Sequence, residues 1–174
     1  MLKNLFLFVF FMLFILFQSQ AATNISGQIR TDTTWTKAGS PYITSGLVEI
    51  ATGVTLTVEP GVTIIVDKWI DIYGDIVLKG TSTDSIYLKS KTSSWRGGLR
   101  FYNYRDSIVL DYCHIHNLGQ LLSFYNTGGS IVHINHTVLE SGLLTIPHGN
   151  IVSGVIVENS SFLNTDPLYG INIT

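Results

Sequence analysis

The stretch Ser107-Ile-Val-Leu-Asp-Tyr-Cys-His-Ile115 is the most informative part of this chain because it recurs twice at a nearly fixed distance. The first recurrence reads Ser130-Ile-Val-His-Ile-Asn-His-Thr-Val138, and the second reads Gly154-Val-Ile-Val-Glu-Asn-Ser-Ser-Phe162. Self-similarity at a fixed period is typical of solenoids and other repeat architectures. We therefore expect a stack of similar structural units.

Each unit is predicted to be a coil of short β-strands. Between Leu47 and Leu88, short runs of alternating, β-branched residues are separated by Gly, Asp, Ser or Pro-Gly, which is the pattern of strands divided by turns. Each period holds three such runs. We expect an all-β parallel β-helix of about five coils, each of about 22 to 24 residues. An antiparallel two-sheet sandwich would also give short strands, but it does not predict the fixed offset.

Stacked coils place equivalent residues in columns. The alignment predicts two inward columns, Ile108–Ile131–Val155 and Ile115–Val138–Phe162, and a column at the bend between strands, Tyr112–Asn135–Asn159. Asn suits such a bend because it tolerates a left-handed backbone, and its amide can bond to the same group one coil away. His133 aligns with Leu110, so either His133 faces the core or the register slips locally onto Ile134.

The N-terminus has the layout of a secretory signal peptide. Lys3 precedes thirteen apolar residues at 5–17, and small residues precede a predicted cut after Ala21. Thirteen residues rise only about 20 Å as a helix, which is short of the hydrocarbon core of about 30 Å. We expect a signal peptide at 1–21, an N-terminal cap segment at 22–46 and the β-helix at 47–174, truncated at its C-terminal end. The chain is then secreted or at the cell surface, with no transmembrane anchor in this segment.

The composition argues against some partners. Charged residues make up 13% of the chain, the net charge is −2, and no basic run is present, so nothing indicates binding to nucleic acid. The single cysteine, Cys113, cannot form an internal disulfide. Packing and hydrogen bonds must therefore stabilise the exported chain.

Several segments resemble right-handed parallel β-helix repeat proteins of the pectate-lyase-like superfamily, in their secreted bacterial cell-surface form. The matching segments are Asp32-Thr-Thr-Trp35, Ser40-Pro-Tyr-Ile43, 53–63, 80–86 and Trp95-Arg-Gly-Gly-Leu-Arg-Phe101, and the resemblance covers roughly residues 27 to 165. It implies a right-handed helix. The same architecture hosts pectate lyases, glycoside hydrolases, adhesins and surface proteins of no known activity, so fold alone does not decide function.

Two sets of acidic residues are candidates, one for catalysis and one for metal binding. Asp111 and Glu158 align in one outward column two coils apart, with Ile134 between them, and side-chain reach brings their carboxyls toward the range of about 6.5 to 9.5 Å used by inverting glycosidases. The alternative is a pair of solvated charges. Asp67, Asp71 and Asp75 are the weak candidates for metal binding. The resemblance implies that Ca²⁺ would be bound only if the protein is a lyase. In that case Lys68, Arg96 or Arg100 would be the catalytic base of the lyase. No cofactor is expected otherwise.

Histidines and aromatic residues supply the remaining candidates. His114 and His116 alternate in a strand and share a face, which can start a Zn²⁺ site, although the sequence shows no third ligand. Trp69, Tyr102 and Tyr104 are candidates for stacking on sugar rings, whereas Trp35 and Trp95 are expected to cap the coils. We expect an exported, non-catalytic surface module that acts as a stalk, adhesin or carbohydrate-contacting protein, with a polysaccharide or cell-surface glycan as partner. The alternative is the N-terminal part of a polysaccharide lyase or glycoside hydrolase.

Overall fold

The structure is a computed structural model of the chain that describes residues 21–91, 97–102, 108–118, 122–125, 130–141, 144–145 and 152–163. The predicted signal peptide lies almost wholly outside these residues. Within them the secondary structure is β-strand, apart from one short 3₁₀ turn, η1 (Lys37–Gly39). No helix in these ranges is long and apolar enough to cross a membrane.

The strands follow one another with short connections over most of the chain. In order they are β1 (Thr23–Ile29), β2 (Thr33–Trp35), β3 (Tyr42–Ile50), β4 (Thr55–Val58), β5 (Thr63–Val66), β6 (Ile70–Ile72), β7 (Asp75–Lys79), β8 (Ile86–Ser90), β9 (Leu99–Tyr102), β10 (Ile108–Asp111), β11 (Cys113–His116), β12 (Leu122–Tyr125), β13 (Ser130–Asn135), β14 (Val138–Glu140), β15 (Leu144–Thr145), β16 (Val152–Glu158) and β17 (Ser161–Leu163).

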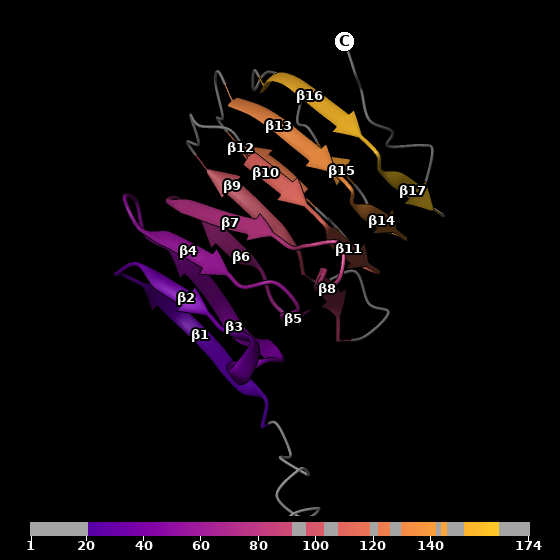
Figure 1. Cartoon of the computed structure of the whole chain (residues 1–174). Coiled ribbons are helices and arrows are strands. Elements are labelled where there is room, and N and C mark those ends of the chain that lie inside the picture. The colour runs from indigo at the N-terminus through magenta and orange to yellow at the C-terminus, as the bar shows by residue number, and fades with distance from the viewer. Residues whose placement is uncertain are drawn as a thin grey trace, which may run out of the picture.

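These strands stack in three parallel columns (Figure 1). The first column is β2, β4, β7, β10, β13 and β16. The second runs from the start of β3 through β5, β8, β11, β14 and β17, and the third from the end of β3 through β6, β9, β12 and β15. Strand β1 pairs in parallel with β3. The chain thus makes about five three-stranded turns, which confirms the predicted parallel β-helix.

The length of one turn varies more than the sequence repeat predicts. Leu99 pairs with Leu122, one repeat further along the chain, as the alignment predicts. The turn from β4 to β7 is shorter, because Val58 lies opposite Leu78. The turn from β7 to β10 is much longer, because Leu78 lies opposite Leu110. Connections between strands can therefore lengthen while the strands stay stacked.

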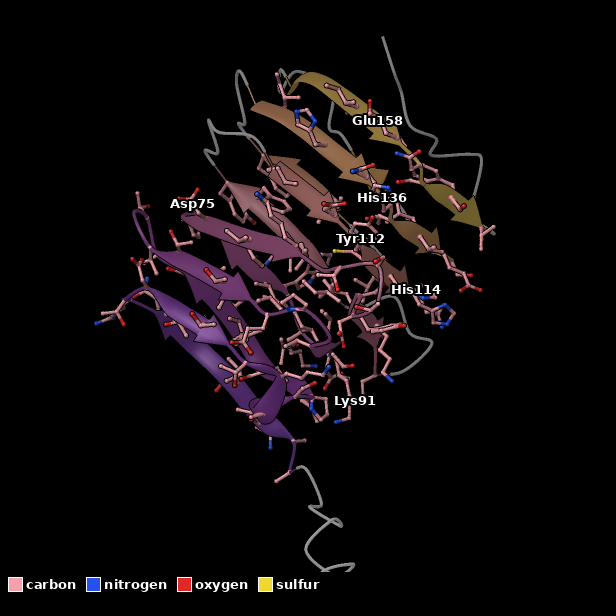
Figure 2. The ribbon with its side chains drawn as sticks, in the orientation of Figure 1. Asp75, Lys91, Tyr112, His114, His136 and Glu158 are labelled. Carbon is pink, nitrogen blue, oxygen red and sulfur yellow. The ribbon has the colours of Figure 1, made fainter. Side chains whose placement is uncertain are left out.

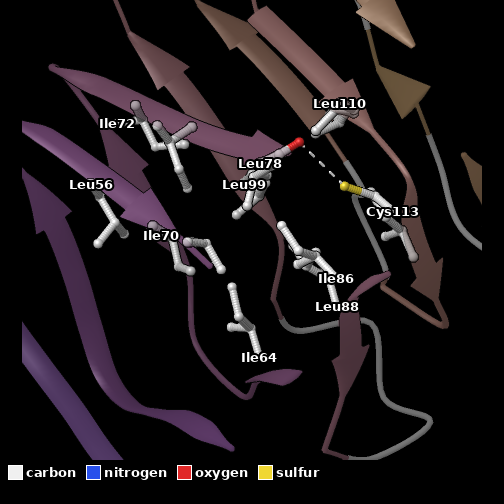
Figure 3. Close-up of a cluster of buried hydrophobic side chains, with 14 of the residues drawn as sticks. Leu56, Ile64, Ile70, Ile72, Leu78, Ile86, Leu88, Leu99, Leu110 and Cys113 are labelled. Carbon is white, nitrogen blue, oxygen red and sulfur yellow. Dashed lines mark hydrogen bonds between the residues drawn. The ribbon is translucent and has the colours of Figure 1, made fainter. Parts of the chain in front are cut away.

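The core consists of continuous inward columns of buried hydrophobic side chains. Figure 3 shows part of this core in close-up. One column is Trp35, Val58, Leu78, Leu110, Ile134 and Val157, and another is Tyr42, Ile64, Leu88, Ile115, Leu139 and Phe162. Most of these side chains are fully buried, and burial of one Leu or Ile stabilises by about 1.5 to 3 kcal/mol. Each coil covers the next, so stability is shared along the stack.

The register between β10 and β13 differs from the sequence alignment by one residue. Ile108 lies opposite Val132, and Leu110 lies opposite Ile134. The predicted place of Ile131 in the inward column with Ile108 is therefore wrong, and Val132 takes it. His133 points outward opposite Val109. This register buries two apolar side chains and leaves an imidazole on the outer face, whereas a shift by one residue would exchange the faces.

The same correction applies to the second column. Ile115 lies opposite Leu139, and Leu139 lies opposite Phe162. Val138, which the alignment placed in this inward column, lies instead opposite His114 and is only partly buried.

The bend between the first and second columns has a left-handed backbone. Tyr112, His136 and Asn159 have φ angles of 49°, 45° and 49°. The prediction of Asn135 at this bend is wrong by one residue, since Asn135 ends strand β13. A hydrogen bond between side-chain amides of neighbouring coils does form, because Asn159 Nδ2 donates to Asn135 Oδ1 at 3.1 Å. The rings of Tyr112 and His136 stack with centroids 4.2 Å apart.

The residue after each bend bonds to the backbone of the neighbouring coil. Thr137 Oγ1 accepts the Cys113 N–H at 3.2 Å, and Ser160 Oγ accepts the Thr137 N–H at 3.1 Å. Both hydroxyls also donate to backbone carbonyls, and Cys113 Sγ donates to the Leu78 carbonyl at 3.6 Å. These side chains satisfy backbone groups that the bend removes from the sheets.

Candidate functional site

The outward face of the third column carries a row of aromatic side chains. Tyr73, Tyr102 and Tyr125 come from successive coils, and their ring centroids are 4.8 Å and 5.0 Å apart with nearly parallel planes. The strand alternation turns them outward, as Tyr102 directly follows the fully buried Phe101. We call Trp69 together with these three tyrosines the aromatic flank.

An ion pair lies in the middle of the aromatic flank. Arg100 donates to Asp71 through Nε at 2.6 Å and Nη2 at 2.8 Å, and its guanidinium lies 4.6 Å from the centre of the Trp69 ring. Asp71 is buried, so a bidentate partner is what allows its charge to remain there. The pair leaves this part of the flank close to neutral and holds Trp69 in place.

The hydroxyl of Tyr102 remains protonated under ordinary conditions. Burial raises the pKa of Tyr102, and the negative charge of Asp71 raises it further. A neutral phenol both donates and accepts hydrogen bonds. The tyrosine row can therefore offer hydroxyl groups in both roles.

The structure brings two of the three predicted sugar-binding residues together. Trp69 and Tyr102 lie on the aromatic flank, and Tyr104 lies outside the described residues. Tyr73 and Tyr125 cover the two faces of the Tyr102 ring, so Tyr102 cannot lie flat against a sugar ring as the sequence-based prediction assumed. Contact with a sugar would use its edge and hydroxyl. Trp35 is buried and stacks on Tyr42 in the core, and Trp95 lies outside the described residues.

The two predicted catalytic carboxylates share a column but differ in surroundings. Asp111 lies opposite Asn135, which lies opposite Glu158, so Asn135 and not Ile134 separates them. Asp111 Oδ1 is 3.2 Å from His136 Nδ1, whereas Glu158 is exposed near the last described coil (Figure 2). The carboxylate of Asp111 is thus already engaged by an imidazole.

The predicted acidic metal ligands do not meet. Asp67 lies 3.8 Å from Lys91 Nζ, Asp71 pairs with Arg100, and Asp75 begins β7 in the first column. In the part of the chain that the structure describes, no three His, Cys, Asp or Glu side chains are gathered closely enough to hold a metal ion in this conformation.

A cluster on the second column combines histidines with a carboxylate that the sequence did not connect to them. Glu140 Oε2 lies 3.0 Å from His116 Nδ1 and 3.6 Å from His114 Nε2. The ring of Tyr87, one coil earlier, contacts His114 at a centroid distance of 5.6 Å. The strand alternation of His114 and His116 was visible in the sequence, but the position of Glu140 depends on the register between coils.

Comparison with known proteins identifies no relative of this chain, because no protein-family model, no curated protein and no solved structure matches it. Its classification therefore follows from its own backbone. The chain is a parallel β-solenoid of about five turns.

Proposed function

We propose that this chain is an exported, non-catalytic β-helix module of the cell-surface or secreted type that contacts carbohydrate through its aromatic flank. The observation that carries the proposal is the row formed by Tyr73, Tyr102 and Tyr125. The row crosses successive coils and so follows the direction in which the coils stack. A linear polymer lying along that direction would meet one tyrosine per coil.

The chemistry of the flank favours a neutral glycan. The flank combines apolar ring edges with hydroxyl groups, and a sugar presents apolar C–H surface beside hydroxyl groups of its own. Asp71 neutralises Arg100, so the described flank has no net positive charge to attract a uronate polymer. Stacking also stabilises the row by about 0.5 to 1.5 kcal/mol for each pair of rings, which holds the hydroxyl groups in position without a ligand.

The alternative is a polysaccharide lyase or glycoside hydrolase of which this chain is the N-terminal part. Such an enzyme would need two carboxylates directed at one sugar or a cage of carboxylates around Ca²⁺. The described candidates Asp111, Asp67 and Asp71 are each engaged by a different basic partner. We therefore place glycan contact ahead of glycan cleavage.

Affinity electrophoresis in gels that contain neutral or acidic polysaccharides tests the proposal. We expect retardation by at least one neutral glycan, a loss of retardation in Tyr125→Ser, and a partial loss in Tyr102→Phe, which keeps the ring and removes the hydroxyl. Tyr87→Ser is the matched control, because Tyr87 is 46% exposed but lies on β8 in the second column.

Two results would contradict the proposal. Equal retardation of the Tyr125 and Tyr87 variants would exclude the aromatic flank as the contact surface. Release of reducing ends or unsaturated uronates from the same polysaccharides would favour the enzyme. Export is tested separately by the mass of the secreted chain, which should begin at Ala22.

A further inference from the structure

The row formed by Tyr73, Tyr102 and Tyr125 has a fixed spacing that restricts which glycans can follow it. Successive ring centroids are 4.8 Å and 5.0 Å apart, and neighbouring ring planes differ by only 12° and 14°. The spacing is that of the coils themselves, because stacked strands lie about 4.8 Å apart. We propose that this row selects an extended, β-1,4-linked polymer of neutral pyranoses. The inference rests on the function proposed above and adds the linkage of the ligand to it.

The row is three rings long. Tyr73 follows Ile72, which lies opposite Ile50, so the residue at the same position one coil earlier is Ala51. At the other end of the row the next strand of the third column is β15, and residues 126–161 include no Phe, Trp or Tyr. The flank therefore offers three evenly spaced contacts to a ligand.

Even spacing along a straight line matches only some linkages. In a β-1,4-linked pyranose chain whose C4 oxygens are equatorial, the two bonds that join a sugar to its neighbours leave opposite ends of the ring. The chain therefore extends by nearly one ring length per sugar, which is close to the spacing of the coils. An α-1,4 or β-1,3 linkage turns the chain at every sugar and moves the following sugars away from the row. Several contacts raise the affinity together only if they can be made at the same time.

The row is also ordered before a ligand binds. Tyr73 and Tyr125 cover the two faces of the Tyr102 ring, and this stacking holds the three rings in a common orientation. Each phenol can donate one hydrogen bond to a sugar oxygen and accept another from a sugar hydroxyl. A preorganised row loses little conformational freedom on binding, so it favours a ligand whose repeat already matches its own.

Calorimetric titration with neutral oligosaccharides of different linkage tests the inference. Cellohexaose, maltohexaose and laminarihexaose are glucose hexamers with β-1,4, α-1,4 and β-1,3 bonds, and mannohexaose is a second β-1,4 hexamer. We expect the better β-1,4 hexamer to bind at least tenfold more tightly than maltohexaose and laminarihexaose. In its series, affinity should rise at least tenfold from the disaccharide to the trisaccharide. It should rise less than fivefold from there to the hexamer, because a longer chain gains only additional ways of lying on three rings.

Two variants locate the binding. Tyr125→Ser removes the last ring, so the affinity for the β-1,4 trisaccharide should fall at least tenfold. The affinity for the disaccharide, which can lie on Tyr73 and Tyr102, should fall less than threefold. Tyr87→Ser is the matched control on the second column and should leave every affinity unchanged, and both variants should keep the circular dichroism of a β-sheet protein. An equal loss of affinity in the two variants would overturn the inference.

The remaining outcomes separate this inference from the proposed function. If maltohexaose or laminarihexaose binds as tightly as the β-1,4 hexamers and Tyr125→Ser still weakens binding, the linkage is wrong and the glycan contact of the aromatic flank stands. The same conclusion follows if no hexamer binds although a neutral polysaccharide retards the protein in a gel. If no hexamer and no neutral polysaccharide binds, both proposals are overturned.

Discussion

Replacing Cys113 with serine should prevent much of the loss of stability that the protein undergoes between pH 9 and pH 11. The Cys113 thiol is only 2% exposed, and burial raises its pKa from 9.0 to about 12. The unfolded chain then loses the thiol proton before the folded chain does. A group whose pKa is higher in the folded state contributes its full stability below the unfolded pKa and loses it as the pH rises toward the folded pKa.

The expected magnitude follows from the two pKa values. One pKa unit corresponds to about 1.4 kcal/mol, so ionisation of the unfolded thiol lowers the free energy of unfolding by about 1 kcal/mol at pH 10 and about 3 kcal/mol at pH 11. Serine does not ionise in this range. It also suits the site, because Thr137 and Ser160 hold the equivalent positions in the next two coils and donate their hydroxyls to backbone carbonyls. At pH 7 the two proteins should differ by no more than about 1 kcal/mol.

Urea unfolding followed by tryptophan fluorescence, with a reducing agent present, measures the effect at each pH from 7 to 11. Tyr102 and the other groups that titrate at high pH are common to both proteins, so the difference between them isolates the thiol. The advantage of Cys113→Ser over the wild type should be near zero at pH 8 and should grow by about 3 kcal/mol by pH 11. Parallel profiles over this range would refute the reasoning.

Three further predictions can be tested by urea unfolding at pH 7. Thr44→Val should lower the free energy of unfolding by about 2 kcal/mol or more, because Thr44 Oγ1 accepts hydrogen bonds from two backbone N–H groups of the next coil at 2.9 and 3.0 Å. A decrease below about 0.5 kcal/mol would show that water replaces this hydroxyl. Asp71→Asn should cost about 3 kcal/mol because it leaves Arg100 without its charged partner, whereas Asp71→Leu combined with Arg100→Met should lie within about 1 kcal/mol of the wild type. Ile134→Ala should cost about 2 to 5 kcal/mol and His133→Ala less than about 1 kcal/mol, and equal costs would contradict the register of β13.

The architecture could be predicted from the sequence because a solenoid imposes the same requirement on every coil. Inward positions must be apolar at equivalent places, so Leu99 reappears one coil later as Leu122. The connections carry no such requirement, and their lengths were not predictable. Asp71 and Arg100 face each other across a turn that is longer than the period seen in the sequence, so their ion pair was not foreseen.

The sequence by itself determined that the chain coils in parallel strands, and that His114 and His116 share an outward face beside the inward Ile115. Only the tertiary structure decided the register between one coil and the next. In the register of the sequence alignment, His133 would have faced the core, and Glu140 would have lain opposite Asn117. The observed register is shifted by one residue, which buries Ile134 and brings Glu140 to His116. Side chains alternate between the two faces of a strand, so a shift by one residue exchanges inward for outward positions. The register is chosen by the burial summed over neighbouring coils, and the sequence of a single repeat does not contain that information.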